Sequence, residues 1–240
     1  MSQIRQVKDI QYRLLPGTSR KTTDIVIERD GSVCVRPPEY MAPEQVDQTV
    51  YSKRMWIYRN LAEWRDLNAS RVVREWVSGE SMLYLGRHYR LELCSGMLDS
   101  LSLKNGRFYI SRDLAEHGGG KGAEKAFIEF YKRKGQQRIA ERLAYFSPKV
   151  GVNGDVFSIG EIGYKWASCK KDGQLHFHWK CMMAPPKILD YIIVHELCHN
   201  HVRTHSDAYW NEVDKVLPDY RVRKQWLREH GASMTLVECD

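Results

Sequence analysis

The sequence predicts an α+β fold, in which an N-terminal part built of antiparallel strands precedes a C-terminal part built mainly of helices. In the first half, residues 10–36 and 72–110 are rich in β-branched and aromatic residues and contain turn pairs such as Asn105–Gly106, which typically join the two strands of a hairpin. In the second half, apolar residues recur at helical spacing, as they do over residues 123–145.

The N-terminal part is expected to contain two strand regions separated by one helix. Residues 10–36 form the first region, with a hairpin whose turn is Asp30–Gly31. Residues 72–110 form the second. Between them, apolar side chains recur three or four positions apart, which indicates an amphipathic helix over residues 43–67. These apolar residues are Val46, Val50, Ile57, Leu61 and Trp64.

Length and composition indicate a globular chain without a membrane-spanning segment. The 240 residues are 42% hydrophobic, enough to bury one core with room for two lobes. No stretch approaches the roughly 18 apolar residues of a transmembrane helix, and residues 1–10 lack the apolar run of a signal peptide. The six cysteines contain no C-x-x-C pair, which argues against a zinc ribbon and fits a reducing compartment. We therefore expect a cytoplasmic location.

The charge balance favours anionic partners. Lys and Arg number 37 against 30 Asp and Glu, a formal charge of +7, which favours contact with nucleic acid or nucleotides. Basic residues concentrate in residues 121–142 and 221–228. Both stretches lie in expected helices, where a solvated helix face accounts for such charges without a nucleic-acid partner.

The glycine-rich segment His117–Gly122 marks the expected boundary between two sub-parts, residues 1–116 and 123–232. It does not match a phosphate-binding loop, because that motif places Ser or Thr after its Lys, whereas Gly122 follows Lys121 here. A long helix is expected after it, and Gly135 is the residue that could interrupt this helix.

Residues 157–181 predict a hairpin with its turn at Asp172–Gly173. Its second arm alternates, so Leu175 and Phe177 face one side while His176 and His178 face the other. The arm reads as a half-buried strand beside the next helix, where an extended peptide could add by backbone hydrogen bonding. We expect the two histidines to be exposed. The alternative is that they form a second metal site or donate hydrogen bonds to a reaction intermediate.

The pattern H-E-x-x-H at residues 195–199 is the main functional signal. It follows Pro185–Pro186 and an apolar series, which together indicate a buried helix with proline in its first turn. Residues four apart share a helix face, so His195 and His199 can aim at one divalent metal ion. Glu196 lies beside that face, where a carboxylate can act on a water molecule without binding the metal.

His205 is the expected third ligand. His201 follows His199 by two residues and would point away if the helix continued. His205 can return to the metal if the helix ends first, and Asn200 is the expected end because Asn tolerates the left-handed conformation. Glu212, on the next predicted helix, is the competing ligand.

Three protein ligands and a free carboxylate favour metal-assisted hydrolysis, with one zinc ion per chain and a polypeptide as the substrate. One alternative is a metal-dependent nucleotide pyrophosphatase, which would use the same metal chemistry and account for the basic balance. The other is a non-catalytic zinc-binding or nucleic-acid-binding protein, which would need a fourth protein ligand or have no use for Glu196. The candidate donors to a tetrahedral intermediate are Tyr209, His201, His178 and Lys165.

Taken together, several stretches of the second half resemble the YgjP-like metallopeptidases, relatives of the SprT-like proteases. The stretches are Lys165–Cys169, His176–Lys180, Met183–Pro186, His195–His199, His205–Ser206, Tyr209–Trp210 and Leu217–Tyr220. The resemblance extends over residues 20–232. It implies a compact mini-zincin fold in which His195, His199 and His205 bind zinc and Glu196 is the catalytic base. One departure is that Lys165 and Ala167 stand where the family usually has Arg and Gly.

Overall fold

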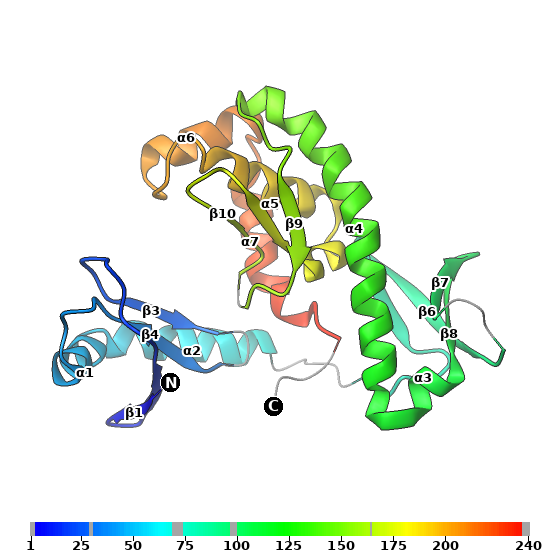
Figure 1. Cartoon of the computed structure of the whole chain (residues 1–240), viewed down its shortest axis with the longest axis horizontal. Helices are drawn as coiled ribbons and strands as arrows, with labels where there is room; N and C mark the ends of the chain where they lie inside the picture. The colour runs from blue at the N-terminus through cyan, green and yellow to red at the C-terminus, as the bar shows by residue number, and fades with distance from the viewer. Residues whose placement is uncertain (1–2, 29–30, 69–73, 97–99, 164, 237–240) are drawn as a thin grey trace. The chain divides into compact units, whose positions relative to one another are not determined.

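The computed structural model describes residues 3–28, 31–68, 74–96, 100–163 and 165–236. The chain divides into two units (Figure 1), one that runs to Arg71 and one over Val72–Glu238. Strands and helices occur in both units, which confirms the predicted α+β class. Within the described ranges, no helix combines the length and apolar character needed to cross a membrane.

The first unit holds a four-stranded sheet in the order β1-β2-β4-β3. The strands are β1 (Gln3–Val7), β2 (Ile10–Leu14), β3 (Asp24–Ile27) and β4 (Val33–Arg36). The pairs β1–β2 and β3–β4 are antiparallel hairpins, as expected, but the central pair β2–β4 is parallel. The predicted antiparallel pairing therefore holds within each hairpin but not for the central pair, because local sequence patterns define hairpins and not how two hairpins join.

Two helices replace the single helix expected at residues 43–67. They are α1 (Pro43–Ser52) and α2 (Arg54–Asn68), separated by Lys53. Pro43 occupies the first turn of α1, and the amide of Ala42 donates to the side chain of Gln45 at 3.1 Å, so a proline and a side-chain cap begin the helix. The predicted apolar positions Val46, Val50 and Ile57 are fully buried against β2 and β4.

The second unit begins with a sheet that repeats the same strand order. It contains β5 (Ser81–Tyr84), β6 (Arg87–Cys94), β7 (Leu101–Lys104) and β8 (Arg107–Ser111), in the order β5-β6-β8-β7. Again two antiparallel hairpins join through a parallel central pair, β6–β8. The predicted turn at Asn105–Gly106 joins β7 to β8, and both residues have positive φ, as a type I′ turn requires.

The glycine-rich segment lies inside the second unit, between α3 (Arg112–Glu116) and α4 (Lys121–Val150). Gly118, Gly119 and Gly120 all have φ between 65° and 78°, a conformation that residues with a Cβ rarely adopt. A Cβ at Gly120 would meet the ring of Trp76 at 2.1 Å. The segment is therefore a packed turn.

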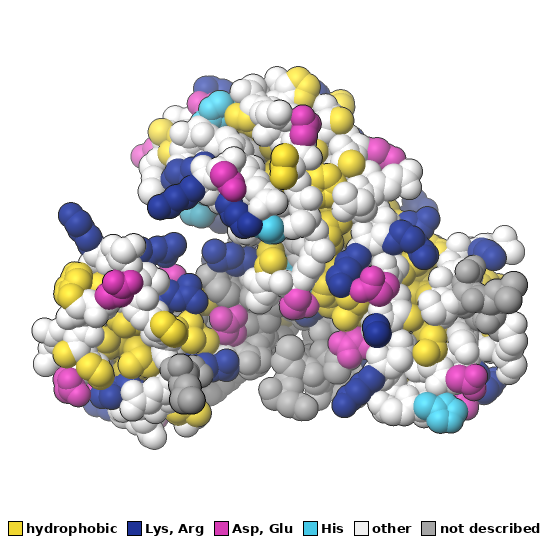
Figure 2. All heavy atoms as spheres, viewed as in Figure 1, with side chains coloured by type: hydrophobic (Ala, Val, Ile, Leu, Met, Phe, Trp, Pro, Cys, Tyr) yellow, Lys and Arg dark blue, Asp and Glu magenta, His cyan; other side chains and the backbone are white. Residues whose placement is uncertain are grey.

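The helix α4 runs without interruption through Gly135, whose lack of a side chain lets Ile159 and Met182 approach its backbone. Its predicted basic stretch is a solvated face, because Lys132 pairs with Glu129 and Arg138 with Glu141. Figure 2 shows Lys and Arg interspersed with Asp and Glu over this part of the surface.

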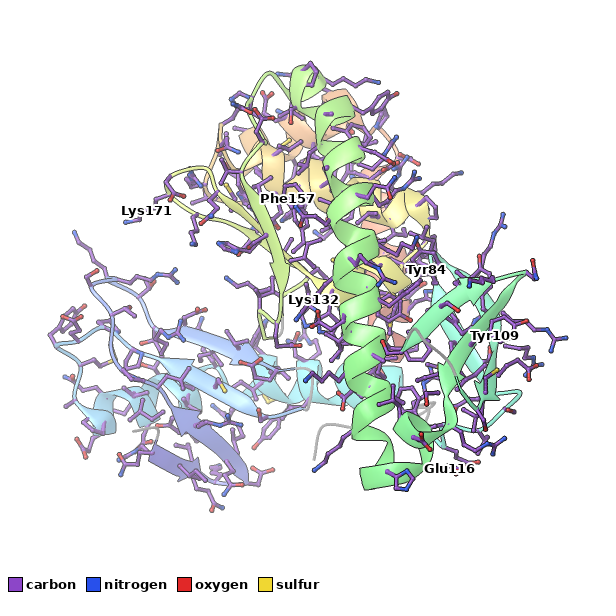
Figure 3. All side chains as sticks on the ribbon, turned by 45° about the vertical axis from the view of Figure 1, so that its right-hand side comes forward. Tyr84, Tyr109, Glu116, Lys132, Phe157 and Lys171 are labelled. Atoms are coloured by element: carbon purple, nitrogen blue, oxygen red, sulfur yellow. The ribbon has the colours of Figure 1, made fainter. Side chains whose placement is uncertain are left out.

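The aromatic core of the second unit joins α4 to the sheet β5–β8. Tyr84 of β5 and Phe108 of β8 pack edge-on against Phe130, with ring centroids 5.4 and 5.2 Å apart respectively, a favoured aromatic geometry. The hydroxyl of Tyr131 donates to the carbonyl of Leu83 at 2.6 Å. In Figure 3, Tyr84 accordingly lies beside α4, whereas Tyr109 lies on the strand farther from it.

The rest of the second unit contains the helix predicted after Pro185–Pro186. Three strands come first, in the order β10-β11-β9: β9 (Phe157–Gly160), β10 (Ala167–Cys169) and β11 (Leu175–His178). The predicted hairpin is β10–β11, which is antiparallel. The strand that leads into the next helix, β11, is central, so β10 and β9 are the two edge strands and a peptide cannot add beside β11 as expected. The helices α5 (Pro186–Cys198), α6 (Asp207–Val216) and α7 (Tyr220–His230) follow.

Candidate metal centre

The helix α5 carries the H-E-x-x-H pattern. Pro186 stands in its first turn, and Leu189, Ile193 and Leu197 are fully buried, so burial of an apolar face fixes how the helix is rotated. The ion pair of Arg142 with Asp190, with contacts of 2.6 and 3.0 Å, ties α5 to α4.

The helix ends differently from the prediction. Asn200 does not have a positive φ, so it does not adopt the left-handed conformation. Instead, the amides of His199, Asn200 and His201 each bond to the carbonyl three residues earlier, at 3.0 to 3.2 Å, which tightens the last turn. The Asn200 side chain also donates to the Leu197 carbonyl at 3.2 Å. Asn200 therefore stops the helix as a side-chain cap.

The structure brings the three predicted histidines together. His195 and His199 lie on one face of α5, and His205 returns to them from the loop before α6. The Nε2 atoms of His195 and His205 are 3.1 Å apart. One nitrogen from each of the three rings lies within 4.8 Å of the others. Glu212 is not part of this group and pairs with Lys215 at 2.6 Å.

This arrangement fits a divalent metal ion. Two nitrogens bound at about 2.0–2.1 Å to a tetrahedral zinc are about 3.3 Å apart, close to the separation of the His195 and His205 Nε2 atoms. His199 directs Nδ1 to the carbonyl of Val202 at 3.1 Å, which fixes its tautomer and leaves Nε2 for the metal. The buried Nδ1 of His195 has no hydrogen-bond partner.

The electrostatics keep these imidazoles neutral. Burial, followed by repulsion from the other two rings, lowers the pKa of His195 to about 3. Burial also lowers the pKa of His199 and of His205. Neutral imidazole is the form that binds metal, because protonation would occupy the nitrogen lone pair.

Glu196 is buried next to the first histidine, with 5% of its surface exposed. Burial raises the pKa of this carboxyl to about 8, against the opposing charge of Lys165 and a hydrogen bond from the backbone of Cys169. Because Cys169 belongs to β10, the edge strand orients the carboxylate. A carboxyl with a pKa near neutrality suits proton transfer.

Aromatic rings surround the histidines, a feature that the sequence patterns did not assign. Tyr209 donates its hydroxyl to the His195 carbonyl at 2.9 Å, and its ring stacks on His199 with centroids 4.6 Å apart. Trp210 stacks between His205 and Tyr220, at 5.6 and 5.1 Å. The sequence did contain a signal for this contact: Tyr209 and Trp210 follow His205 by about one helical turn, a spacing at which side chains can meet.

The candidate donors lie in different surroundings. The Tyr209 hydroxyl is engaged by the His195 carbonyl, and Nε2 of His201 lies 2.8 Å from the carbonyl of Val150. His178 is fully buried and contacts Glu161 at 2.6 Å. Of the four candidate donors, Lys165 is the one whose positive charge acts on both Glu196 and His199.

The expectation of exposed strand histidines was wrong. His178 has no exposed surface, and His176 is only partly exposed and contacts the Ser158 hydroxyl at 2.5 Å. The chain turns into a 3-10 helix at Trp179, so the alternation ends there. Glu161, which also accepts from the Trp179 indole at 2.8 Å, supplies the partner that makes burial of His178 favourable.

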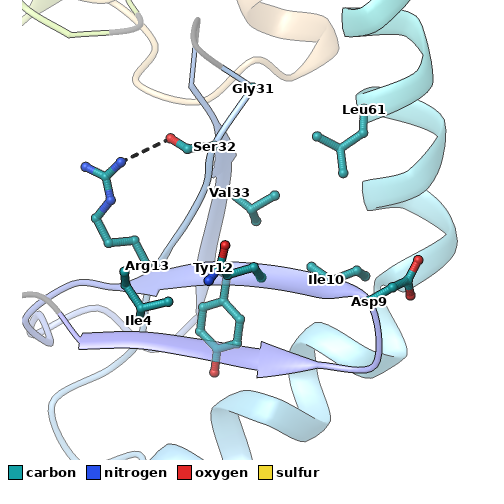
Figure 4. Close-up of a pocket in the computed structure, with 10 residues that line it drawn as sticks. Ile4, Asp9, Ile10, Tyr12, Arg13, Gly31, Ser32, Val33 and Leu61 are labelled. Carbon is teal, nitrogen blue, oxygen red and sulfur yellow. Dashed lines mark hydrogen bonds between the residues drawn. The ribbon is translucent and has the colours of Figure 1, made fainter. Parts of the chain in front are cut away.

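A separate pocket of about 360 Å³ lies in the first unit and contains none of these residues. Figure 4 shows Leu61 of α2 facing Val33 across it, with Arg13 bonded to the Ser32 hydroxyl at 3.3 Å. Its lining does not gather ionisable groups in the manner of the histidine site.

Comparison with known proteins finds a metallopeptidase family model that matches most of the chain. A family model described as YgjP-like, metallopeptidase domain, matches residues 21–230. Among solved structures, the crystal structure of the metallopeptidase zymogen of Pyrococcus abyssi abylysin is 22% identical, with a TM-score of 0.35. That match covers 40% of this chain and 97% of the other. A search of curated proteins finds no match.

Proposed function

We propose, because this chain belongs to the YgjP-like metallopeptidase family, that it hydrolyses peptide bonds with one zinc ion held by His195, His199 and His205. Membership of this family makes the chain a metal-dependent hydrolase. The observation that carries the finer proposal is the meeting of the three histidine nitrogens within 4.8 Å beside the buried carboxyl of Glu196.

When bound, zinc supplies a Lewis acid that polarises a carbonyl and lowers the pKa of water to about 7. Glu196 then acts as the general base: its carboxylate accepts the proton of the attacking water and passes it to the leaving nitrogen. The hydrogen bond from Cys169 holds the carboxylate in place between these two transfers. Tyr209 supports the site by holding the His195 backbone, because its hydroxyl donates to the His195 carbonyl.

The polypeptide substrate would lie along β10. This strand is at the sheet edge, and an extended peptide can add to an edge strand through backbone hydrogen bonds. Its Cys169 amide bonds to Glu196, so a peptide beside β10 would pass close to the general base. Lys165, two residues before the same strand, is the donor we assign to the developing oxyanion.

Metal analysis combined with one substitution tests this function. Wild type should hold about one zinc per chain and cleave an unfolded protein substrate, because three neutral imidazoles form the site. Glu196→Gln should keep the metal and lose about 10²–10⁴-fold in kcat, since general-base catalysis contributes that much. Zinc-dependent release of phosphate from nucleoside triphosphates, with no peptide cleavage, would instead identify a pyrophosphatase.

A further inference from the structure

Besides Glu196, the charged side chains that act on the histidine site, among the described residues, are three cations. Lys224 acts on His195 and His205. Arg203 acts on His199, and Lys165 acts on both His199 and Glu196. The cations therefore fall into two groups, Arg203 with Lys165 on the side of β10, and Lys224 on the side of α7.

Arg203 is held rigidly in this position. Its guanidinium donates to the carbonyls of Lys170 and Lys171, at 2.8 and 3.2 Å, and to the sulfur of Cys169 at 3.3 Å. These bonds fasten it to the turn after β10 without neutralising its charge, because none of the three acceptors is a carboxylate. Figure 2 shows Lys and Arg side chains over the part of the second unit that carries β10, beside histidine and with acidic side chains among them.

Lys224 is positioned by the aromatic stack. Its ammonium lies 4.2 Å from the centre of the Trp210 ring, a cation–π contact, and the same ring stacks on His205. The stack therefore holds the ammonium of Lys224 at the edge of the histidine site.

Neither cation has an acidic partner among the described residues. Two nearby carboxylates pair with other cations, Glu212 with Lys215 at 2.6 Å and Asp219 with Arg223 at 2.9 Å. The carboxylate of Asp172, in the turn after β10, accepts from the amide of Gln174 at 3.0 Å. Two positive charges beside one site, Arg203 at the turn after β10 and Lys224 over Trp210, raise the local concentration of anionic ligands and favour their binding.

We propose that this site selects polypeptides with acidic side chains on both sides of the bond to be cleaved, one side contacting Arg203 and the other Lys224. This inference rests on the proposed peptidase function. A peptide fits better than a nucleotide because different elements hold the two cations, the turn after β10 for Arg203 and α7 for Lys224, and because the edge strand β10 runs beside Glu196. The glycine-rich segment does not match a phosphate-binding loop, and its Gly120 is packed against Trp76.

Cleavage of matched peptides tests the selectivity. One peptide sequence is prepared with Glu, Gln or Lys at the positions flanking the scissile bond, on one side at a time. Wild type should prefer Glu over Gln by about 5-fold in kcat/KM for each side, the value of a good exposed ion pair, and the preference should shrink in high salt. Lys224→Gln should remove it on one side only, and Arg203→Gln on the other.

Two further variants separate charge from structure. Lys224→Arg keeps the charge over Trp210 and should retain the preference. Arg221→Gln removes a cation from the same helix that is not among the charges acting on the three histidines, so it should cleave like wild type. Equal cleavage of the Glu and Gln peptides by wild type, or a preference that survives both Lys224→Gln and Arg203→Gln, would overturn the proposal.

A binding measurement distinguishes failure of the selectivity from failure of the peptidase function. Fluorescence anisotropy of the same peptides with Glu196→Gln reports affinity without turnover. Preferential binding of the Glu peptides that depends on Lys224 would support the selectivity even if wild type cleaved none of them, in which case the peptidase function fails. Cleavage without any charge preference in binding would leave the peptidase and overturn the selectivity. Tighter, Lys224-dependent binding of ATP than of every peptide would overturn the assignment to polypeptides.

Discussion

The Nε2 atoms of His195 and His205 face each other across 3.1 Å, although the two residues belong to a helix and to the loop that follows it. The separation approaches that of two ligands on one tetrahedral ion. Four predictions follow from this relationship and from contacts elsewhere in the chain.

Replacing His205 should release the metal, whereas replacing its competitor should not. His205→Ala removes one of three nitrogens, so the affinity for zinc should fall more than about 100-fold, beyond the effect typical of losing an outer partner. Competition with a chromogenic chelator measures this directly. Glu212→Ala is the matched control, since its carboxylate pairs with Lys215. Loss of zinc from Glu212→Ala with retention by His205→Ala would reverse the assignment.

The Trp210 ring should tune the metal site by holding His205. Trp210→Leu keeps an apolar side chain but removes the stack with His205 and Tyr220, so zinc affinity should fall about 10-fold, as it does when an orienting partner is lost. Trp210→Phe retains an aromatic face and should lose less. Trp226→Leu, which removes a stack on His230 instead, serves as the control. Equal affinities in all three variants would show that the ring only fills space.

Two glycines in one turn should respond differently to a methyl group. Gly120→Ala places a Cβ 2.1 Å from the Trp76 ring, whereas Gly118→Ala meets nothing within 4 Å. Both incur the cost of positive φ, but the first adds overpacking worth about 1–3 kcal/mol. Urea unfolding monitored by Trp fluorescence should therefore show Gly120→Ala as the less stable variant. Equal midpoints would mean that Trp76 can move aside.

The first unit should lose stability in acid through Asp47. A hydrogen bond from Arg5, and another from the hydroxyl of Tyr12 at 2.6 Å, outweigh partial burial and hold the pKa of Asp47 below its ordinary value. A depressed folded-state pKa means that this contribution is present above the unfolded pKa, about 3.9, and is lost as the pH falls through the folded value.

Asp47→Asn should accordingly be less stable than wild type at pH 7, with the difference shrinking toward pH 2. Thermal unfolding of the two proteins across this range measures the difference. Asp24→Asn is the control, because Asp24 forms an exposed pair with Arg20 at 3.6 Å, which contributes little. A constant difference between wild type and Asp47→Asn at every pH would show that titration of Asp47 plays no part.

Local patterns in the sequence predicted much of the fold. The β10–β11 hairpin, the turn at Asn105–Gly106 and the buried face of α5 depend on residues only a few positions apart, and each is present in the structure. The turn at Asp30–Gly31 lies partly outside the described residues, although the strands on either side of it pair as expected.

The sequence by itself determined the chemistry of the site, because His195, Glu196 and His199 obtain their relative placement from the helical repeat. Only the tertiary structure decided the parallel joins β2–β4 and β6–β8, the burial of His178 against Glu161, and the placement of Lys224 over the Trp210 ring that stacks on His205. These features join segments far apart in the chain. Their energies come from side-chain packing and charge pairing between whole elements, which no local periodicity encodes.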